Sequence, residues 1–187
     1  MTSAVAPPKR RSISVETSDG VRIEIPAKRF VWLRAFLPFW LGAWLLGEVS
    51  VPIGFIRDGF DANTPFMLLW LCLWTAAGGF VWFALLYNWS GREVVSINDE
   101  RLSVQTWVLG RPIRKREFAM SDVRHLRFSP QIYDPSKFAS GLQAWGLGGG
   151  SVAFDHGAST IRFGAALDET ESNMLIAEIK RRFAIAD

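Results

Sequence analysis

Few side chains in this sequence have the types and spacing that catalysis or metal binding requires. Of the two histidines, His125 lies in an expected strand and His156 in an expected tight turn. A histidine in either setting is usually structural or simply exposed. Cys72 is the single cysteine, so one chain can form neither a disulfide nor a thiolate metal site. HExxH, GxSxG, CxxC and P-loop patterns do not occur, and the carboxylates are scattered. We therefore expect that the protein is not an enzyme and that it needs no cofactor and no metal.

A cluster of basic residues between positions 111 and 127 is the clearest candidate for binding. It carries six lysine and arginine residues, offset by Glu117 and Asp122. Next to a bilayer, such a cluster attracts anionic headgroups by about 1 kcal/mol per basic residue. It could equally be the solvated face of a strand, on which charges prevent aggregation. Nucleic acid is a poor alternative, because exposed aromatic residues are not interleaved with the charges. The residues expected to contact lipid headgroups are Arg114, Lys115, Arg116 and Arg124.

The second candidate for binding is the segment 131–150, which is long for a loop within a compact domain. It is too apolar for a plain solvated loop, and aromatic side chains of this kind often anchor protein interfaces. The segment could instead dip into the bilayer surface or form a short helix over the domain's own core. If it binds a protein partner, the contacting residues are expected to be Tyr133, Phe138 and Trp145.

Two long apolar stretches predict a membrane anchor. Seven of the nine tryptophans lie between residues 30 and 90, where charged residues are nearly absent. Residues 65–87 carry no charge and are long enough, at about 1.5 Å per residue, to cross a hydrocarbon core of roughly 30 Å. Asn63 or Thr64 is expected to cap this helix, with Pro65 in its first turn.

The first span, which begins near residue 30, leaves two alternatives. The helix can end near Glu48, with residues 49–60 in the membrane interface, and we favour this interpretation. It can also continue through Pro52 to about residue 56, and Glu48 would then be a buried functional carboxylate, because charges within a membrane are costly. Together the spans form a hairpin over residues 30–87. Small residues are expected where its helices pack together, namely Gly42, Gly47, Ala76, Ala77, Gly78 and Gly79.

The distribution of lysine and arginine predicts the orientation of this hairpin. Residues 1–34 carry seven basic residues, whereas residues 48–64 carry only Arg57, together with three acidic residues. Basic loops stay on the cytoplasmic side of a membrane. We therefore expect a multi-pass protein of the bacterial inner membrane, with both termini in the cytoplasm and a short acidic loop outside.

The chain before the membrane alternates polar and apolar residues, which is typical of half-buried strands. Residues 1–11 are expected to form a flexible basic leader. The segment 12–26 predicts a β-hairpin with its turn at Asp19-Gly20, because Asp-Gly between two alternating runs is a strong hairpin signal.

Residues 92–187 predict a second, mostly β, domain that ends in an amphipathic helix over 168–184. Asp168 and Glu171 form a capping-box pattern at the start of this helix. Its expected buried stripe is Leu175, Ile179 and Phe183. The strands of the domain are expected at residues 93–97, 101–108, 112–118, 124–129, 151–155 and 159–165.

This order of strands followed by one helix resembles a bacterial pleckstrin-homology-like (PH-like) domain. The likeness rests on INDERLSVQTWVLGRPIRKREFAMSDVRHLRF, on STIRF, and on the helix from Asp168, with Ser121-Asp122-Val123 at a step between strands. It covers about residues 92–185, or 30–185 with the membrane hairpin. Six strands follow the membrane where this fold usually has seven, so the hairpin 12–26 is expected to join the sheet. The layout is also similar to that of the photosystem I assembly factor of thylakoids.

The expected fold class is therefore a membrane α-helical hairpin plus a mainly-β, PH-like cytoplasmic domain, whose antiparallel strands are closed by a C-terminal amphipathic helix. The resemblance implies a membrane-anchored, non-enzymatic scaffold or assembly factor whose cytoplasmic domain engages another membrane protein. The alternative function is an anionic-lipid-sensing module that acts through the basic strand face. An enzyme with a membrane-buried site around Glu48 is a third hypothesis. The expected partners are thus a membrane protein or complex and the lipid bilayer, with no nucleic acid.

Overall fold

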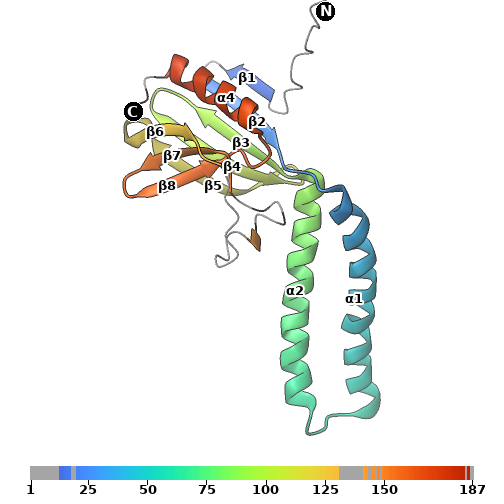
Figure 1. The fold of residues 1–187 in the computed structure, drawn as a ribbon. Helices are drawn as coiled ribbons and strands as arrows, with labels where there is room; N and C mark the ends of the chain where they lie inside the picture. Colours follow the sequence, from blue (N-terminus) through green and yellow to red (C-terminus); the bar gives the residue numbers. More distant parts are fainter. Residues whose placement is uncertain are drawn as a thin grey trace, which may run out of the picture. The chain divides into compact units, whose positions relative to one another are not determined.

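The computed structural model describes residues 13–17, 20–130, 141–142, 145, 147, 149–183 and 185. The chain divides into two compact units. Residues 29–89 form a helical unit, and residues 1–28 together with 90–187 form a β unit. The helical unit is therefore inserted into the chain of the β unit (Figure 1).

Two long helices make up the helical unit: α1, Val31–Asp58, and α2, Thr64–Ser90. Their 28 and 27 residues give each a length of about 40 Å, which exceeds the thickness of a hydrocarbon core. By length and composition, both helices can cross a membrane. The two apolar helices expected from the sequence are therefore present.

The prediction that the first helix ends near Glu48 is wrong, because α1 continues through Pro52 to Asp58. A proline inside a helix removes the hydrogen bond that its missing N–H would donate to the carbonyl four residues earlier. The other polar backbone groups keep their helical hydrogen bonds, and an apolar environment offers them no alternative partner. Helix formation therefore outweighs the local cost of Pro38 and Pro52.

The start of α2 is held by side chains of the short loop that precedes it. The backbone N–H of Asp61 donates to Thr64 Oγ1 at 2.8 Å, and that of Asn63 donates to Asp61 Oδ1 at 3.0 Å. The N–H of Met67 donates to the Asn63 carbonyl at 3.0 Å. Pro65 lies in the first turn, where a helix needs no N–H donor. The helix thus begins where the sequence predicts, although it ends three residues later, at Ser90.

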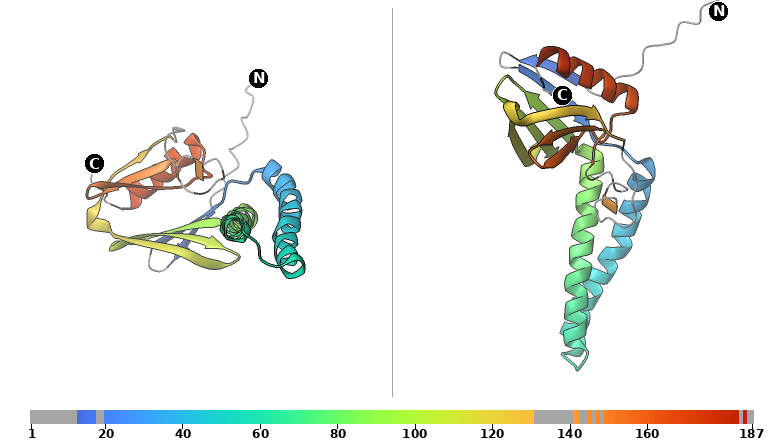
Figure 2. Two further views of the ribbon diagram at one scale, coloured as in Figure 1. Left: turned by 90° about the horizontal axis from the view of Figure 1, so that it is seen from below. Right: turned by 60° about the vertical axis from the view of Figure 1, so that its left-hand side comes forward.

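The β unit, where described, forms two antiparallel sheets that are the layers of a sandwich (Figures 1 and 2). The larger sheet has five strands in the order β1-β2-β3-β4-β5. Their bounds are β1 Ile13–Thr17, β2 Gly20–Pro26, β3 Arg92–Ile97, β4 Arg101–Val108 and β5 Arg111–Ala119. A single 3-10 turn, η1 at Met120–Asp122, leads to the smaller sheet. Its strands, in the order β6-β7-β8, are β6 Val123–Phe128, β7 Val152–His156 and β8 Ser159–Phe163.

The N-terminal hairpin belongs to the larger sheet. β2 pairs with β3 along its length, from Val21 opposite Ile97 to Pro26 opposite Arg92. One further hydrogen bond, 2.9 Å long, joins the Ala27 N–H to the Gly91 carbonyl. The two strands that flank the helical insertion are therefore direct neighbours in the sheet.

The core of the β unit lies between the two sheets and the helix α4, Glu169–Arg182. The expected capping box of Asp168 and Glu171 is present, and α4 lies against β6. Leu175 and Ile179 are buried as expected, and Phe183 packs against the core while partly exposed. The strands nevertheless form two separate sheets, so the expectation of strands closed by the helix holds only in part.

Candidate functional site

The two helices of the helical unit pack where tryptophans meet glycines. Trp44 is almost fully buried, and a Cβ atom on Gly78 would overlap its indole ring. A Cβ atom on Gly47 would lie 3.4 Å from Trp74 Nε1, which is close packing. These two glycines confirm that small residues let the helices approach each other. The other expected contact positions are exposed instead: Gly42, Ala76, Ala77 and Gly79.

Polar contacts also join α1 to α2, at three different depths along the helices. Hydrogen bonds between apolar helices add to van der Waals packing in holding particular helix faces together. The contacting pairs are Arg34 with Asn88 at 3.1 Å, the Trp44 indole N–H with the Trp74 carbonyl at 3.1 Å, and Glu48 with Thr75 at 2.7 Å.

Large apolar side chains cover the outward faces of both helices. Ile56 is 86% exposed, Phe39 is 78% exposed and Phe66 is 68% exposed. Burial of apolar surface is favourable by about 25 cal/mol per Å², so such faces are unfavourable in water. Polar groups that bond between the helices and apolar groups that point outward are the arrangement that a lipid environment favours.

The contact of Glu48 with Thr75 is the one place where a carboxylate enters the helix pair. Thr75 Oγ1 lies 2.7 Å from Glu48 Oε1 and 2.8 Å from the Leu71 carbonyl. The second carboxylate oxygen, Glu48 Oε2, is buried and has no hydrogen-bond partner in the part of the chain that the structure describes. The indole N–H of Trp74 is likewise buried and has no hydrogen-bond partner among the described residues. The Trp74 ring stacks on the Trp70 ring, with ring centroids 4.9 Å apart.

The four residues expected to contact lipid headgroups do not form one surface. They are Arg114, Lys115 and Arg116 in the edge strand β5, and Arg124 in β6. Arg114 and Arg116 share a strand face with Phe118, which packs against the core, whereas Lys115 points to the opposite face. Lys115 forms an ion pair of 2.6 Å with Glu117, and this hydrogen bond lowers the pKa of the Glu117 carboxyl. Headgroup binding by all four residues at once is therefore not favoured by their placement.

A carboxylate that the sequence analysis missed, Glu93, lies on the core-side face of β3. Its Oε2 accepts a hydrogen bond of 2.7 Å from the Gly164 N–H, which ties β3 to the turn before α4. Burial raises the pKa of Glu93, while hydrogen bonds from the backbone of Gly164 and Ala165 and the charge of Arg116 oppose this rise. Alternation along β3 could have revealed it, because Glu93 shares a face with the buried Val95.

The outer face of the smaller sheet carries a polar cluster around Asp155. Arg127 binds both carboxylate oxygens of Asp155, at 2.7 and 3.1 Å, and Thr160 Oγ1 donates to Oδ1 at 2.7 Å. The hydrogen bond from Arg127 lowers the pKa of Asp155, and Asp155 in turn raises the pKa of Arg127. Arg124 lies opposite Asp155 in the strand register, so this face is basic around one neutralised carboxylate.

Both histidines border an open depression of about 670 Å³ beside this cluster. His156 packs edge-to-face on Phe118 with ring centroids 5.1 Å apart, and its Nε2 lies 3.9 Å from Asp122. His125 is exposed, and its positive φ of 50° marks the bulge that interrupts β6. His156 therefore has a packing role, and the bulge places His125 at the surface.

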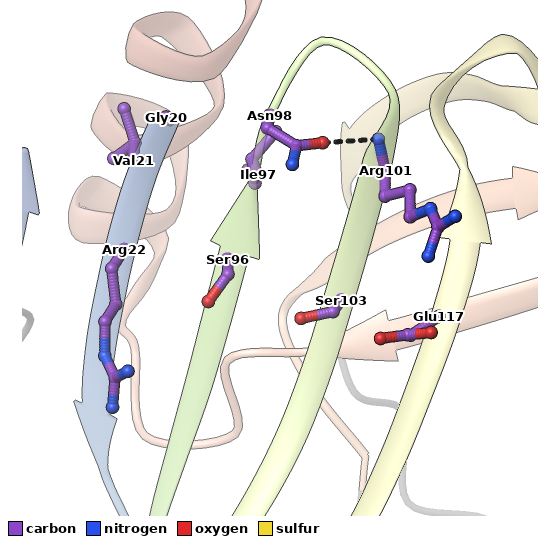
Figure 3. A pocket seen from close by; sticks show the side chains of 9 residues that line it. All are labelled: Gly20, Val21, Arg22, Ser96, Ile97, Asn98, Arg101, Ser103 and Glu117. Atoms are coloured by element: carbon purple, nitrogen blue, oxygen red, sulfur yellow. Dashed lines mark hydrogen bonds between the residues drawn. The ribbon is translucent and has the colours of Figure 1, made fainter. Parts of the chain in front are cut away.

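A second, shallow pocket of about 390 Å³ lies on the outer face of the larger sheet (Figure 3). Arg101 stands at its rim, where its backbone N–H donates to Asn98 Oδ1 at 2.6 Å. Four polar residues on neighbouring strands form a row across this pocket: Arg22, Ser96, Ser103 and Glu117. Alternating polar positions of this kind are usual on the solvated face of an antiparallel sheet.

The expected partner-binding segment is described only in part. Tyr133 and Phe138 lie outside the described residues. Trp145 is half-buried, and its backbone N–H donates to the Leu142 carbonyl at 3.1 Å, next to the buried Leu147. Partner binding through this segment remains a prediction.

Within the described ranges, no three His, Cys, Asp or Glu residues are grouped so that they could hold a metal ion. Comparison of the chain with protein-family models, with curated proteins and with solved structures finds no match. The function must therefore be inferred from the geometry of the chain itself.

Proposed function

We propose that this chain is a membrane-anchored, non-enzymatic adaptor whose β domain engages another membrane protein. One observation carries the proposal: the helices hydrogen-bond to each other through their polar side chains and expose bulky apolar ones. This arrangement suits lipid and not water. The basic residues before α1 and the acidic loop after it support a bacterial inner-membrane location with both termini in the cytoplasm.

We also propose that the β unit is a PH-like domain. Without β1, its elements are a four-stranded meander, β2 to β5, a three-stranded sheet, β6 to β8, and the C-terminal helix α4. Seven strands followed by one helix is also the order of the PH-like domain that the sequence resembles. In this assignment β2 is the first of the seven strands and precedes the two apolar helices. The helical pair would then be an insertion between the first two strands of the domain.

The short links between the two units support an adaptor that works at the membrane surface. Only Gly91 separates the end of α2 from the start of β3, and residues 27–30 separate β2 from α1. Because β2 and β3 are paired, both links start from the same place in the sheet. A domain held in this way cannot move far from the bilayer, so its partner must be in or next to the membrane.

The test uses the full-length protein in bacterial membranes. Alkaline carbonate should leave it in the membrane, and detergent should extract it. A photoreactive amino acid at Trp145 should crosslink to a distinct membrane protein, and the same amino acid at Ala158, an exposed turn position, should not. Release by carbonate, or external protease cleaving a C-terminal tag on intact cells, would contradict the proposal.

A second candidate function is binding of anionic lipid headgroups, favoured by the basic outer face of the smaller sheet. Arg124 and Arg127 both lie there, beside the open depression. Full-length protein in nanodiscs should show slower hydrogen exchange in residues 123–128 when phosphatidylglycerol replaces phosphatidylcholine. The difference should disappear in high salt and in Arg124→Gln, because screening weakens exposed charge interactions. Equal exchange in both lipids would exclude this function.

A further inference from the structure

We propose that the turn between β4 and β5 inserts into the surface of the bilayer, with Leu109 and Ile113 as its apolar contacts. The partner of this turn is lipid, at the boundary between the headgroups and the acyl chains. The inference rests on the proposed membrane location of α1 and α2. It adds to the proposed function a second place, besides the links to the helices, at which the β unit meets the membrane.

A hydrogen bond fixes the depth of this turn. The backbone N–H of Leu109 donates at 3.0 Å to the hydroxyl of Ser90, a residue of the β unit that is also the last residue of α2. With 27 residues, α2 is about 40 Å long and the hydrocarbon core is about 30 Å thick, so the helix ends reach the headgroup layers. Trp89, which precedes Ser90, is 53% exposed, and tryptophan is common in this layer. Leu109 therefore lies at the level of the headgroups.

The residue at the tip of the turn is unusual for its backbone conformation. Val108 pairs with Arg111, so the turn has two central residues. These are Leu109 and Gly110, and both have a positive φ, of 50° and 75°. Such turns favour Asn, Asp or Gly, because most side chains crowd the backbone in this conformation. Leu109 is nevertheless apolar and 62% exposed, and contact with lipid accounts for an apolar side chain at this position.

A bulge next to the turn exposes a second apolar side chain. The register of β4 with β5 shifts between Thr106 and Trp107, which leaves Ile113 without a partner residue in β4. Bulges of this kind change the direction in which a side chain points. Ile113 is 49% exposed. Two large apolar side chains, Leu109 and Ile113, are thus exposed within five residues of each other at one end of the sheet.

The charges around the turn suit the surface of a bilayer. Residues 105–116 carry four basic residues and no acidic residue. One of them, Arg111, is exposed directly beside the tip. Basic residues near a bilayer surface are attracted to anionic headgroups. An apolar tip next to a basic flank is therefore complementary to a surface with anionic headgroups above acyl chains.

Lipid fits this turn better than a protein partner does. A specific protein interface buries about 800 Å² on each partner, which is far more than two side chains provide. Insertion into lipid needs no such area, because Gly91 alone links α2 to β3 and already keeps the β unit at the membrane. A contact within a tethered molecule avoids most of the entropic cost of association. Two apolar side chains are therefore sufficient for this contact.

The experiment uses the full-length protein in nanodiscs of phosphatidylglycerol and phosphatidylcholine. A small fraction of the phosphatidylcholine carries a photoreactive diazirine in its acyl chain, close to the ester. After irradiation and digestion, mass spectrometry locates the lipid adducts. Residues 107–113 should carry adducts. Residues 98–100, which form the turn at the other end of β4, should carry none, because the eight residues of β4 separate the two turns by about 26 Å.

Substitutions separate lipid contact from folding. Leu109→Asn places a favoured residue at positive φ, so the variant should be at least as stable as the wild type in thermal unfolding. Its adduct yield in residues 107–113 should fall by about five- to tenfold, because an amide replaces an apolar side chain. Leu109→Met should keep the yield, and Asp99→Asn, in the turn at the other end of β4, should leave it unchanged. If Leu109→Asn lowers the stability, Ile113→Thr, which stays β-branched, should show the same loss of yield.

Two results would overturn the inference: no adduct in residues 107–113, as when a second copy or another protein covers the turn, or a yield that these polar substitutions leave unchanged. Adducts on α1 and α2 are the internal reference. If the helices carry adducts and the turn does not, the turn stays out of the bilayer and the membrane location of the helices stands. If the helices carry none, the proposed membrane location is wrong as well.

Discussion

The contact between Trp44 and Gly78 allows the packing of the helix pair to be tested by one methyl group. A Cβ atom at Gly78 would overlap three atoms of the Trp44 indole, namely Cε2, Cζ2 and Nε1. At Gly79, the next residue, an added Cβ meets no atom within 4 Å. Gly78→Ala should therefore destabilise the helix pair, and Gly79→Ala should not.

The expected loss of stability of the helix pair in Gly78→Ala follows from two opposing effects. Overpacking a close contact costs about 1–3 kcal/mol. Alanine returns up to about 1 kcal/mol through its better helix propensity. Because the overlap at Gly78 involves three ring atoms, the upper end of the overpacking range applies, and Gly78→Ala should cost about 2 kcal/mol after this gain. Gly79→Ala should be neutral or slightly stabilising.

A double-mutant cycle identifies Trp44 as the cause. Phenylalanine has no atom at the Cζ2 position, so Gly78→Ala should cost at least about 1 kcal/mol less in a Trp44→Phe background. Trp44→Phe alone should cost about 0.6–1.7 kcal/mol, because it loses the hydrogen bond to the Trp74 carbonyl. The coupling free energy between the two positions should therefore be at least about 1 kcal/mol.

Unfolding of the full-length protein by SDS in mixed micelles, followed by circular dichroism, measures these free energies. Equal destabilisation by Gly78→Ala and Gly79→Ala would refute the packing described here. So would additive effects of Trp44→Phe and Gly78→Ala, since additivity means that the two residues do not touch.

Three further predictions concern the β unit. Burial places the pKa of Glu93 above its value in the unfolded chain, so the ionised carboxylate opposes folding, and its contribution to the free energy of unfolding should fall as the pH rises through the ordinary range of a glutamate. Glu93→Gln should remove this contribution and match or exceed the wild type at neutral pH. Urea titrations of both proteins from pH 4 to 8 measure the difference, and a wild type that loses no stability relative to Glu93→Gln as the pH rises would contradict the prediction. Asp168→Ala should destabilise the protein by about 1 kcal/mol through loss of the α4 cap, and Asp168→Asn should cost much less, as measured by thermal unfolding. Arg127→Gln should raise the pKa of Asp155 toward its usual range, which carboxyl NMR chemical shifts can follow; an unchanged Asp155 titration would show that the bidentate contact is absent in solution.

Local signals were sufficient to predict most of the secondary structure. Two-residue alternation placed β3 to β8 close to their observed bounds, and the pattern of Asp168 and Glu171 located the start of α4. The uncharged run 65–87 located α2, because an apolar segment of this length is typical of a membrane-spanning helix. These features depend on residues close together in sequence, which is why sequence alone suffices.

The sequence was less informative about features that depend on contacts between distant parts of the chain. Pro52 and Glu48 suggested a helix end, but the helix continues, because polar backbone groups in an apolar environment have no better hydrogen-bond partners than one another. The candidate headgroup ligands looked like one basic face, yet alternation along β5 sends Lys115 to one side and Arg116 to the other. The environment of Glu93 depends on Gly164, which lies far along the chain, so no local pattern predicts that contact.

The insertion of the helices between β2 and β3 has a consequence for folding. Residues 27–91 separate these paired strands, and bringing together the ends of so long a segment costs entropy if it is unstructured. When α1 and α2 pair antiparallel, both of their outer ends come to the same side, and the helix pair then acts as the turn of a β-hairpin. Contacts such as that of Arg34 with Asn88, near these ends, therefore favour the pairing of β2 with β3 as well. Pairing of the helices thus favours pairing of β2 with β3, and variants that weaken the helix pair should also weaken this part of the larger sheet.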